Sequence, residues 1–583
     1  MKKLLVYMKH YKKETVLAPL FKMLEASFEL FVPLVMAAMV DVGIKNADYP
    51  YIIKMGLLLV LLAVVGLATS VTAQFFSAKA AVGFAAEIKH VLFQHIQSMN
   101  YAKTDEIGTS TLITRLTSDM NQVQSGVNLV LRLFLRSPIV VFGAMIMAFT
   151  IDVKAALIFV VTIPLLSIVV FGVMLISIPL YKKVQAALDK VLGITRENLS
   201  GVRVIRAFCR EEKEQELFDG YNDNLTKLQM FVGRISALMN PVTYIIVNAA
   251  TIVLIYTGAV QVDEGILTRG EVIALVNYMS QILVELVKLA NLIITVTKAV
   301  ACGNRIQAVL DTPAGIRVYT NEEHKKNIQA QGDISSAKVV FEHASLRYPG
   351  AGADSLSDIH VTVKKGETVG IIGGTGSGKS SLVQMIPRFY DATGGRVLVD
   401  GKDVKTYEPE VLKEKVGMVP QKAVLFRGTI RNNIRWGKND ATDEEIWKAL
   451  ESAQAKEFVE EKEGRLDFEI QQGGRNLSGG QKQRLTIARA LVKQPEILIL
   501  DDSASALDYA TDAALRKAIR ELSDEMTVFI VSQRTASVLH ADKIIVLEDG
   551  DVAGIGTHDE LLASCEVYRE IHESQLTGRK EAE

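Results

Sequence analysis

The chain has 583 residues, and its 65 Lys and Arg residues nearly balance 66 Asp and Glu residues. This length allows several domains, and the near-zero net charge argues against the broad positive field with which proteins bind nucleic acids. Hydrophobic residues make up 49% of the chain although 22% are charged, so a very apolar part must be joined to an ordinary soluble one.

Six apolar stretches, all before residue 300, are long enough to cross a membrane, which takes about 20 residues each. They cover residues 16–40, 55–76, 127–150, 155–178, 241–262 and 272–296. The basic segment before the first stretch is not followed by a cleavage site of small residues, so it predicts a short helix leading into a retained span. The sequence thus predicts a six-helix transmembrane domain over residues 1–311.

Basic residues gather between the fourth and fifth stretches, whereas residues 152–154 and 263–269 hold few of them. Short basic loops remain in the cytoplasm. We therefore expect a multi-pass protein of the bacterial cell membrane with both termini in the cytoplasm.

Two of the connections, residues 77–126 and 179–240, keep a helical periodicity. Pro179 and Pro241 enclose an interval without proline, which would break a helix. A helix over residues 51–100 would be about 75 Å long, more than twice the bilayer core. We predict long cytoplasmic helix extensions; separate soluble helical hairpins are the alternative.

The chain turns polar over residues 312–337, which predicts a linker. Residues 338–583 alternate short β-rich runs with helical segments, which is typical of an α/β domain with a largely parallel sheet. The cysteines, Cys209, Cys302 and Cys565, form no CxxC pair, so neither a disulfide nor a metal site is expected from them.

A phosphate-binding loop follows the apolar run TVGII and precedes a helical run. It fits the pattern GxxxxGK[ST], in which glycines let backbone N–H groups surround phosphates, the lysine meets the β and γ phosphates, and the hydroxyl binds Mg²⁺. We predict that ATP is bound by Gly373, Gly374, Thr375, Gly376, Ser377, Gly378, Lys379, Ser380 and Ser381.

Farther along, the apolar run 497–500 leads into Asp501 and Asp502. A strand that ends in carboxylates beside the phosphates can supply a ligand to Mg²⁺. Asp501 is the predicted ligand, together with Ser380. Without the phosphate-binding loop, Asp-Asp after a strand would more simply be a turn or a helix cap.

The segment LSGGQ opens a predicted helix, and its residues are Leu477, Ser478, Gly479, Gly480 and Gln481. It resembles the signature motif of ATP-binding cassette (ABC) transporters, and six spans followed by one nucleotide domain resemble a half-transporter of the exporter type. A helix N-terminus is also a physical anion site. The resemblance implies a P-loop ATP-binding cassette domain that sandwiches ATP against the signature motif of a second domain.

The resemblance implies further roles. Tyr348 would stack on adenine, Gln421 would sense Mg²⁺ and the attacking water, and Ser505 to Asp508 would form a loop across the dimer interface. Residues 101–116 and 201–218, where Gly108 and Gly201 are expected to interrupt the helices, resemble coupling segments that contact nucleotide domains. Solvated amphipathic helices are the alternative there.

Two positions depart from the family pattern. The residue after the magnesium aspartate is usually Glu, which activates the attacking water, and here it is Asp502; the switch histidine is replaced by Gln533. Asp is one methylene shorter, and a general base must come within about 2.6–3.2 Å of its target. Gln can donate a hydrogen bond to a phosphate but cannot carry the charge of a protonated His.

We interpret the chain as an ABC-type transport ATPase and one half of a heterodimeric exporter. Its own site would be degenerate and slow, and its intact signature would complete the site of a partner half-transporter that carries Glu and His. ATP and Mg²⁺ are the expected cofactors, and membrane lipids and small amphipathic cargo the other partners. A homodimer and an ATP-gated regulatory subunit are the alternatives; six spans exclude a soluble ABC ATPase.

Ionisable residues also occur within or near the spans: Lys22, Glu25, Glu29, Glu285 and Lys288. Such groups are costly in lipid, so they should face away from it. Glu29 and Glu285 either line an inward-open cavity that prefers cationic cargo or pair with Lys288, Arg132 or Arg136 inside the bundle.

Overall fold

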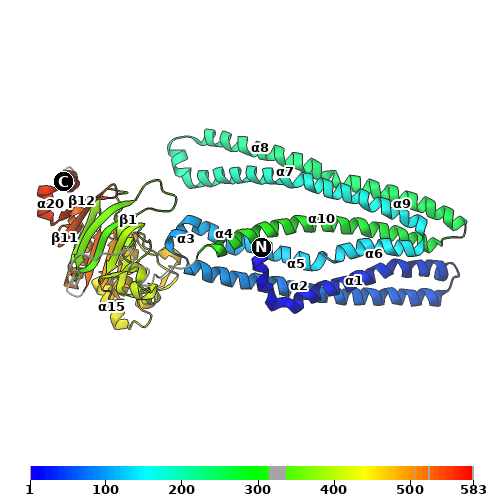
Figure 1. The fold of residues 1–583 in the computed structure, drawn as a ribbon, viewed down its shortest axis with the longest axis horizontal. Helices are drawn as coiled ribbons and strands as arrows, with labels where there is room; N and C mark the ends of the chain where they lie inside the picture. Colours follow the sequence, from blue (N-terminus) through cyan, green and yellow to red (C-terminus); the bar gives the residue numbers. More distant parts are fainter. Residues whose placement is uncertain (1, 314–336, 505, 523–525, 581–583) are drawn as a thin grey trace. The chain divides into compact units, whose positions relative to one another are not determined.

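The computed structural model describes residues 2–313, 337–504, 506–522 and 526–580 (Figure 1). Two compact units are present: Met1–Gln97 with Ser110–Pro313, and Ser98–Thr109 with Ala314–Glu583. Almost all of the predicted linker lies outside the described residues.

In the first unit, six helical stretches among the described residues are long and apolar enough to cross a membrane. The elements are η1 (Lys2–Tyr11), α1 (Lys12–Ala38), η2 (Met39–Ile44), α2 (Tyr49–Ser98), α4 (Thr109–Thr114), η3 (Arg115–Asp119), α5 (Met120–Leu133), α6 (Arg136–Ile151), α7 (Val153–Ala207), α8 (Glu211–Ala237), α9 (Met239–Asp263) and α10 (Arg269–Asp311).

The long helices confirm the prediction of extensions beyond the bilayer, because α2 has 50 residues and α7 has 55. One detail of the prediction is wrong. Helix α7 runs through Gly201 and ends at Ala207, because one glycine costs a helix interior only about 1 kcal/mol. It also contains Pro179, as membrane helices can when neighbouring groups satisfy the freed backbone. Gly108 does interrupt the chain, with φ at 81°.

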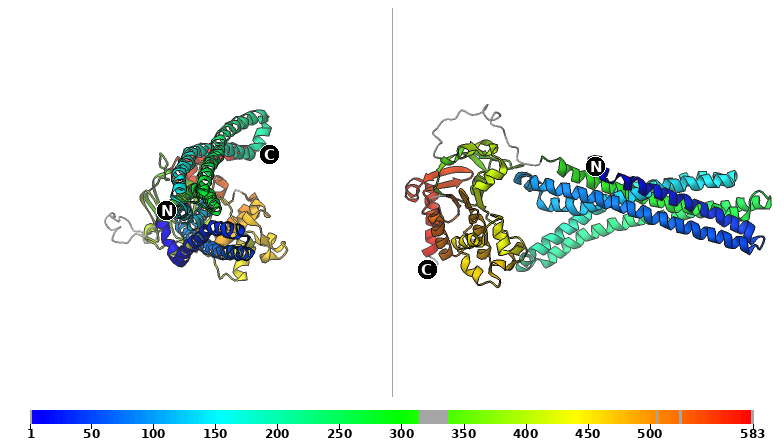
Figure 2. Two further views of the ribbon diagram at one scale, coloured as in Figure 1. Left: turned by 90° about the vertical axis from the view of Figure 1, so that its right-hand side faces the viewer. Right: turned by 90° about the horizontal axis from the view of Figure 1, so that it is seen from below.

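Helix α10 is the centre of this unit. It contacts α1, α5, α6, α7 and α9, and its inward residues, among them Leu275, Tyr278 and Ile282, are buried in a common apolar core. Helices α7 and α8 run side by side as an antiparallel pair (Figure 1, Figure 2).

The second unit contains two large sheets. Its strands are β1 (Ala337–Leu346), β2 (Leu356–Lys364), β3 (Thr368–Gly373), β4 (Gly394–Val399), β5 (Lys402–Asp403), β6 (Val416–Val419), β7 (Gly428–Thr429), β8 (Glu469–Ile470), β9 (Ile497–Asp501), β10 (Thr527–Val531), β11 (Lys543–Glu548) and β12 (Asp551–Gly556).

Its helices are α3 (Tyr101–Ile107), α12 (Lys379–Gln384), η4 (Val404–Thr406), α13 (Pro409–Lys415), α14 (Ile430–Arg435), α15 (Asp443–Ser452), α16 (Lys456–Glu460), η5 (Arg465–Asp467), η6 (Gln472–Gly474), α17 (Gly479–Leu491), α18 (Tyr509–Glu521), α19 (Thr535–Val538), α20 (His558–Ser564) and α21 (Glu566–Lys580).

The central sheet has the order β12-β11-β3-β10-β9-β6, and all of its pairings are parallel except that of β11 with β12. The largely parallel sheet is thereby confirmed. Two of the predicted runs, 338–343 and 396–400, lie instead in a separate antiparallel sheet with the order β2-β1-β4-β5. Apolar strand runs look alike in either kind of sheet, so the pattern alone did not separate them.

Candidate nucleotide-binding site

The phosphate-binding loop connects β3 to α12 at the carboxyl edge of the central sheet. Gly376 and Gly378 have φ angles of 88° and 92°, in the left-handed region that favours glycine. A Cβ on Gly378 would also lie 2.6 Å from Leu356 Cδ2. These two positions therefore require glycine for the loop to close on itself.

The two reactive side chains of this loop lie at the start of α12. Lys379 Nζ donates a hydrogen bond to the Gly373 carbonyl at 2.9 Å, and Ser380 Oγ donates one to Asp501 Oδ1 at 2.8 Å. Burial lowers the pKa of Lys379, against the opposing effect of Asp502 and Asp501. The loop, the lysine and the carboxylates thus form one site, as the sequence predicted.

Asp501 ends β9, next to β10, and Val531 of β10 pairs with both Asp501 and Ile371 of β3. Burial raises the pKa of Asp501, although its hydrogen bond from Ser380 acts in the other direction. A hydroxyl and a carboxylate this close match the oxygen ligands that Mg²⁺ prefers. Ser380 and Asp501 are therefore the residues that would hold Mg²⁺; among the described residues, no group of three or more His, Cys, Asp or Glu is suited to a metal.

Asp502 follows directly, with its backbone at φ 46° and its N–H bonded to the Val531 carbonyl at 3.0 Å. Gln421 Nε2 donates to Asp502 Oδ2 at 3.2 Å. Gln421 therefore meets Asp502 in this structure, whereas its predicted contact with Mg²⁺ stays a prediction.

Gln533 is an exposed residue that lies two residues beyond the end of β10. Strand β10 lies between β3, which leads into the phosphate-binding loop, and β9, which ends in Asp501. The topology thus brings the two departures from the family pattern, Asp502 and Gln533, to the same edge of the sheet as Lys379.

Tyr348 lies beside this loop. Its hydroxyl is 2.9 Å from Ser381 Oγ, and its ring meets the edge of Tyr390 at a centroid distance of 5.0 Å. A hollow of about 610 Å³ adjoins Tyr348 and includes Arg347 and Pro349. An aromatic ring beside an open hollow is suited to stacking on a base.

The signature segment forms the N-terminus of α17. Ser478 accepts a hydrogen bond from the N–H of Gln481, and the Gln481 side chain accepts one from the N–H of Ser478, which completes a capping box. Leu477 is buried and anchors the turn, while Ser478 and Gly479 are exposed. The exposed helix end is therefore available to a ligand from outside this domain.

Asp508 caps α18 by accepting hydrogen bonds from the N–H and hydroxyl of Thr511, at 2.8 and 2.9 Å. These bonds lower the pKa of its carboxyl group. Ser505 lies outside the described residues. The role of this loop in a dimer stays a prediction.

Sequence reasoning missed a polar link behind the signature helix. Arg489 of α17 donates to the carbonyls of Asn433 and Val424 at 2.9 and 3.0 Å, and Asn433 in turn bonds the backbone of Phe426. The link joins α17 to the segment that follows Gln421. No motif marks these residues, since an arginine in a helix usually faces solvent.

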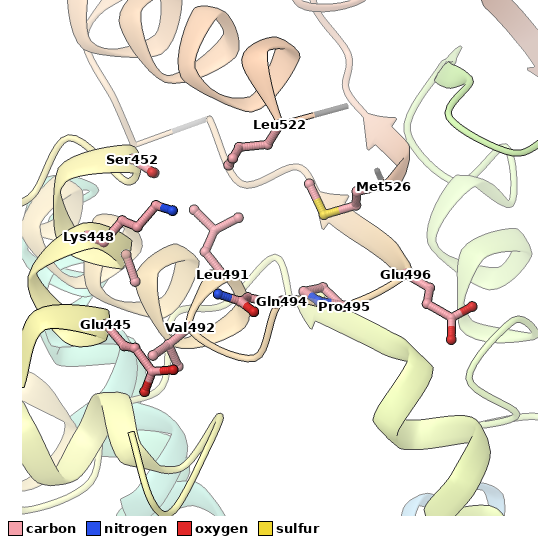
Figure 3. Close-up of a pocket in the computed structure, with 11 residues that line it drawn as sticks. Glu445, Lys448, Ser452, Leu491, Val492, Gln494, Pro495, Glu496, Leu522 and Met526 are labelled. Carbon is pink, nitrogen blue, oxygen red and sulfur yellow. The ribbon is translucent and has the colours of Figure 1, made fainter. Parts of the chain in front are cut away.

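A separate pocket of about 320 Å³ lies at the opposite ends of the same strands (Figure 3). Pro495 and Glu496 directly precede β9, and Met526 directly precedes β10. Neither Lys379 nor Asp501 lines it, so it is not the nucleotide site.

Comparison with known proteins agrees with this site. Residues 15–286 match the model of the ABC transporter transmembrane region, and residues 356–505 match that of the ABC transporter nucleotide domain. The uncharacterized ABC transporter ATP-binding protein YfiB of Bacillus subtilis is 36% identical over the whole of both chains. The chain belongs to the ABC transporter family. An ATP-dependent lipid A-core flippase of Yersinia pestis is 29% identical over 97% of this ABC transporter and 96% of the flippase.

The fold is that of an exporter. A solved structure of a bacterial Atm1-family ABC exporter with ATP bound matches with a TM-score of 0.78 and 22% sequence identity. The match covers 97% of this chain and 98% of the exporter chain. This ABC transporter is thus an ATP-hydrolysing transport enzyme of the membrane, with six spans and a cytoplasmic nucleotide-binding domain.

The first predicted coupling segment of this ABC transporter contacts the nucleotide unit. The Tyr101 ring stacks on Phe389 at 4.3 Å, and the Tyr390 hydroxyl donates a hydrogen bond to Asp105. Burial and the Asp105 carboxylate raise the pKa of Tyr390, which keeps the phenol protonated as the donor. Tyr390 also touches Tyr348, so one residue connects the segment to Tyr348, whose stacking on adenine stays a prediction.

The charged groups of the membrane unit form pairs. Arg136 lies 2.6 Å from Glu29 and 3.2 Å from Glu285, and Lys288 lies 2.8 Å from Glu285. Lys22 pairs with Glu25 at 2.5 Å. The structure therefore supports pairing inside the bundle. The cavity hypothesis does not hold for Glu285, whose side chain is only 4% exposed, while Glu29 remains 43% exposed.

Proposed function

We propose that this chain is one half of a heterodimeric ABC exporter, in which its own ATP site hydrolyses slowly and its signature motif completes the fast site of the partner. The observation that carries the proposal is the convergence of Asp502 and Gln533 on the edge of the sheet that also holds Lys379 and Asp501. Asp502 keeps the carboxylate but shortens its reach, Gln533 replaces the ionisable imidazole with an amide, and the binding groups remain.

The reach of Asp502 supports slow hydrolysis. Its backbone is held by the bond to Val531, so its carboxylate cannot advance by a shift of the chain without breaking that bond. Glu would extend the carboxylate by about 1.5 Å, one C–C bond. That distance is larger than the tolerance of about 0.6 Å within which a general base works.

In this proposal Ser380 and Asp501 bind Mg²⁺ and Lys379 binds the β and γ phosphates, so that ATP stabilises the closed dimer. The exposed N-terminus of α17 supplies the anion-binding end to the phosphates of the partner's ATP. The partner must then bring its own phosphate-binding loop, a Glu and a His.

Exposed apolar residues around the start of the second predicted coupling segment support a contact with another chain. Leu199, Val204 and Phe208 at the end of α7 are 60% or more exposed. An apolar group at a cytoplasmic helix tip is typical of a contact surface. As cargo we propose a lipid or another small amphipathic molecule, in line with the flippase among the relatives.

A homodimer is the second candidate, because Gln421 contacts Asp502 and the pair could still orient a water molecule. The test is to purify the chain alone and in its native complex, reconstitute both in nanodiscs, and compare ATP hydrolysis. We expect the chain alone to be at least about 100-fold slower, the contribution of a positioned base. Rapid, cargo-stimulated hydrolysis by the chain alone would establish the homodimer instead. Hydrolysis by the complex without uphill cargo accumulation in vesicles would indicate a regulatory subunit.

A further inference from the structure

Gln575 of the C-terminal helix contacts the loop that carries Gln533. Gln575 Nε2 donates a hydrogen bond to the Gln533 carbonyl at 2.7 Å. Gln575 Oε1 accepts two more, from the N–H of Thr535 at 2.9 Å and from its hydroxyl at 3.0 Å. One amide thus connects Gln533 to Thr535 at the start of α19.

Helix α21 contacts this loop through two residues. Thr535 is only 4% exposed, and its hydroxyl is also 3.3 Å from His572 Nδ1, one turn before Gln575 on α21. Removal of Gln575 would leave the N–H of Thr535 without this acceptor, and a buried donor without an acceptor is destabilising. The loop would then change its conformation to regain partners.

Helix α21 can act as a fixed support. Tyr568 is fully buried between α21 and the central sheet, together with Ile372 of β3 and Val546 of β11, and its hydroxyl is 2.7 Å from His558 Nδ1. Ile372 lies directly before the phosphate-binding loop. The same packing therefore fixes α21 relative to the strand that leads into that loop.

We propose that Gln575 is a positioning residue for the switch position: through the Gln533 carbonyl and Thr535 it holds the Gln533 amide toward the γ-phosphate of ATP. The proposal rests on the proposed function, in which ATP binds at this edge of the sheet, and adds that the Gln533 amide donates a hydrogen bond to the γ-phosphate. It assigns part of the site's geometry to the C-terminal helix, a segment outside the matched residues 356–505.

The test measures binding of ADP and of a non-hydrolysable ATP analogue to the full-length protein in nanodiscs, with Mg²⁺. Q575A should weaken the affinity for the ATP analogue by about tenfold, which is the contribution of a hydrogen bond to a charged group. Since ADP lacks the γ-phosphate, its affinity should stay within twofold of that of the natural chain. Q575E keeps the acceptor for Thr535 and loses the donor to Gln533, so it should reproduce the loss even if Q575A folds poorly. E570A, an exposed residue of the same helix, is the control and should change neither affinity.

Q533A should show the same selective loss, and the Q533A/Q575A double variant should show no further loss. The proposal would be overturned if Q575E weakened the binding of ADP and of the ATP analogue equally, or if it changed neither affinity. It would also be overturned if the losses of affinity in Q533A and Q575A added together in the double variant. An unchanged ATP preference in Q533A would also overturn it. Because no hydrolysis is measured, these outcomes are independent of whether the proposed heterodimer or its slow site is correct.

Discussion

At the residue scale, we expect Asp502 and Gln533 to limit ATP hydrolysis, because Asp is one methylene shorter than Glu and Gln lacks the imidazole of His. If these two residues are the cause, D502E together with Q533H should raise ATP hydrolysis by the purified chain. We expect an increase of at least about 100-fold in kcat, the contribution of a positioned base, with little change in ATP affinity. ATP hydrolysis by the chain alone is the measurement.

D502N/Q533H is the matched control, because it has no carboxylate at residue 502 and should remain slow. If D502E/Q533H hydrolyses ATP no faster than the natural chain, another feature limits hydrolysis. The heterodimer would then need different support.

Residue-level motifs were the part of the site that the sequence could predict. The phosphate-binding loop, Asp501 and the signature are short continuous segments whose spacing fixes their chemistry, and the structure brings the first two together through Ser380 and Asp501. Gln575, Arg489 and Tyr390 could not be found in this way. Their roles depend on contacts between distant segments, and no local pattern encodes such contacts.

At the scale of elements, Tyr390 links α3 to Tyr348. Y390F removes the hydrogen bond to Asp105 and keeps the ring that touches Tyr348. We expect weaker stimulation of ATP hydrolysis by cargo, by about two- to twelvefold, since a single exposed hydrogen bond contributes about 0.5–1.5 kcal/mol. Cargo-stimulated and basal hydrolysis of the native complex should be compared.

E106A is the control for this experiment, because Glu106 lies on the same short helix and pairs only with Lys103 among the contacts described. Equal stimulation in Y390F and the natural chain would contradict a coupling role for this hydrogen bond. D105N should resemble Y390F.

His558 at the start of α20, which contacts Tyr568 of α21, should also make the nucleotide domain sensitive to acid. Burial lowers the pKa of His558 below its usual 6.5, helped by His572 and His540 and opposed by Asp559. The unfolded chain therefore binds a proton at His558 more readily than the folded domain does. The folded domain has its full stability above about pH 6.5 and loses stability as the pH falls below this value. The melting temperature should decrease on acidification from pH 7.5 to 5.5.

H558Q should reduce this pH dependence, because Gln cannot be protonated and can still bond the Tyr568 hydroxyl. H360Q, at an exposed position on β2, should leave it as in the natural chain. Identical pH profiles for H558Q and the natural chain would exclude His558 as the cause.

The lengths of the helices were predictable from the sequence, whereas only one of the two predicted interruptions, Gly108, is present. A helix of 50 residues follows from an unbroken periodicity, as in α2. Gly201 lies within α7, as does Pro179, because tertiary packing and the membrane outweigh local propensity. The separate antiparallel sheet was missed for a related reason, since strand partners are chosen by tertiary contacts.

At the scale of the whole membrane bundle, the ionic cluster of Arg136 joins three helices at one depth. Arg136 and Glu285 each lie about 24 Å, or 16 residues, from the outer ends of α6 and α10. That places the cluster in the inner part of a hydrocarbon core about 30 Å thick. Glu29 brings in α1, so Arg136 holds together α1, α6 and α10 through two carboxylates.

R136Q should therefore destabilise the bundle, because among the described contacts it leaves Lys288 as the remaining cation beside the buried Glu285, together with the Ser137 hydroxyl, and leaves Glu29 without Arg136. Breaking a buried ion pair costs about 3 kcal/mol, which corresponds to a melting temperature about 2–5 °C lower for a protein of this size. K288Q should cost less, since Glu285 keeps Arg136. The double variant R136Q/E285Q should be more stable than R136Q, because it removes the uncompensated carboxylate; a double variant that melts below R136Q would show that packing, rather than charge pairing, holds these three helices.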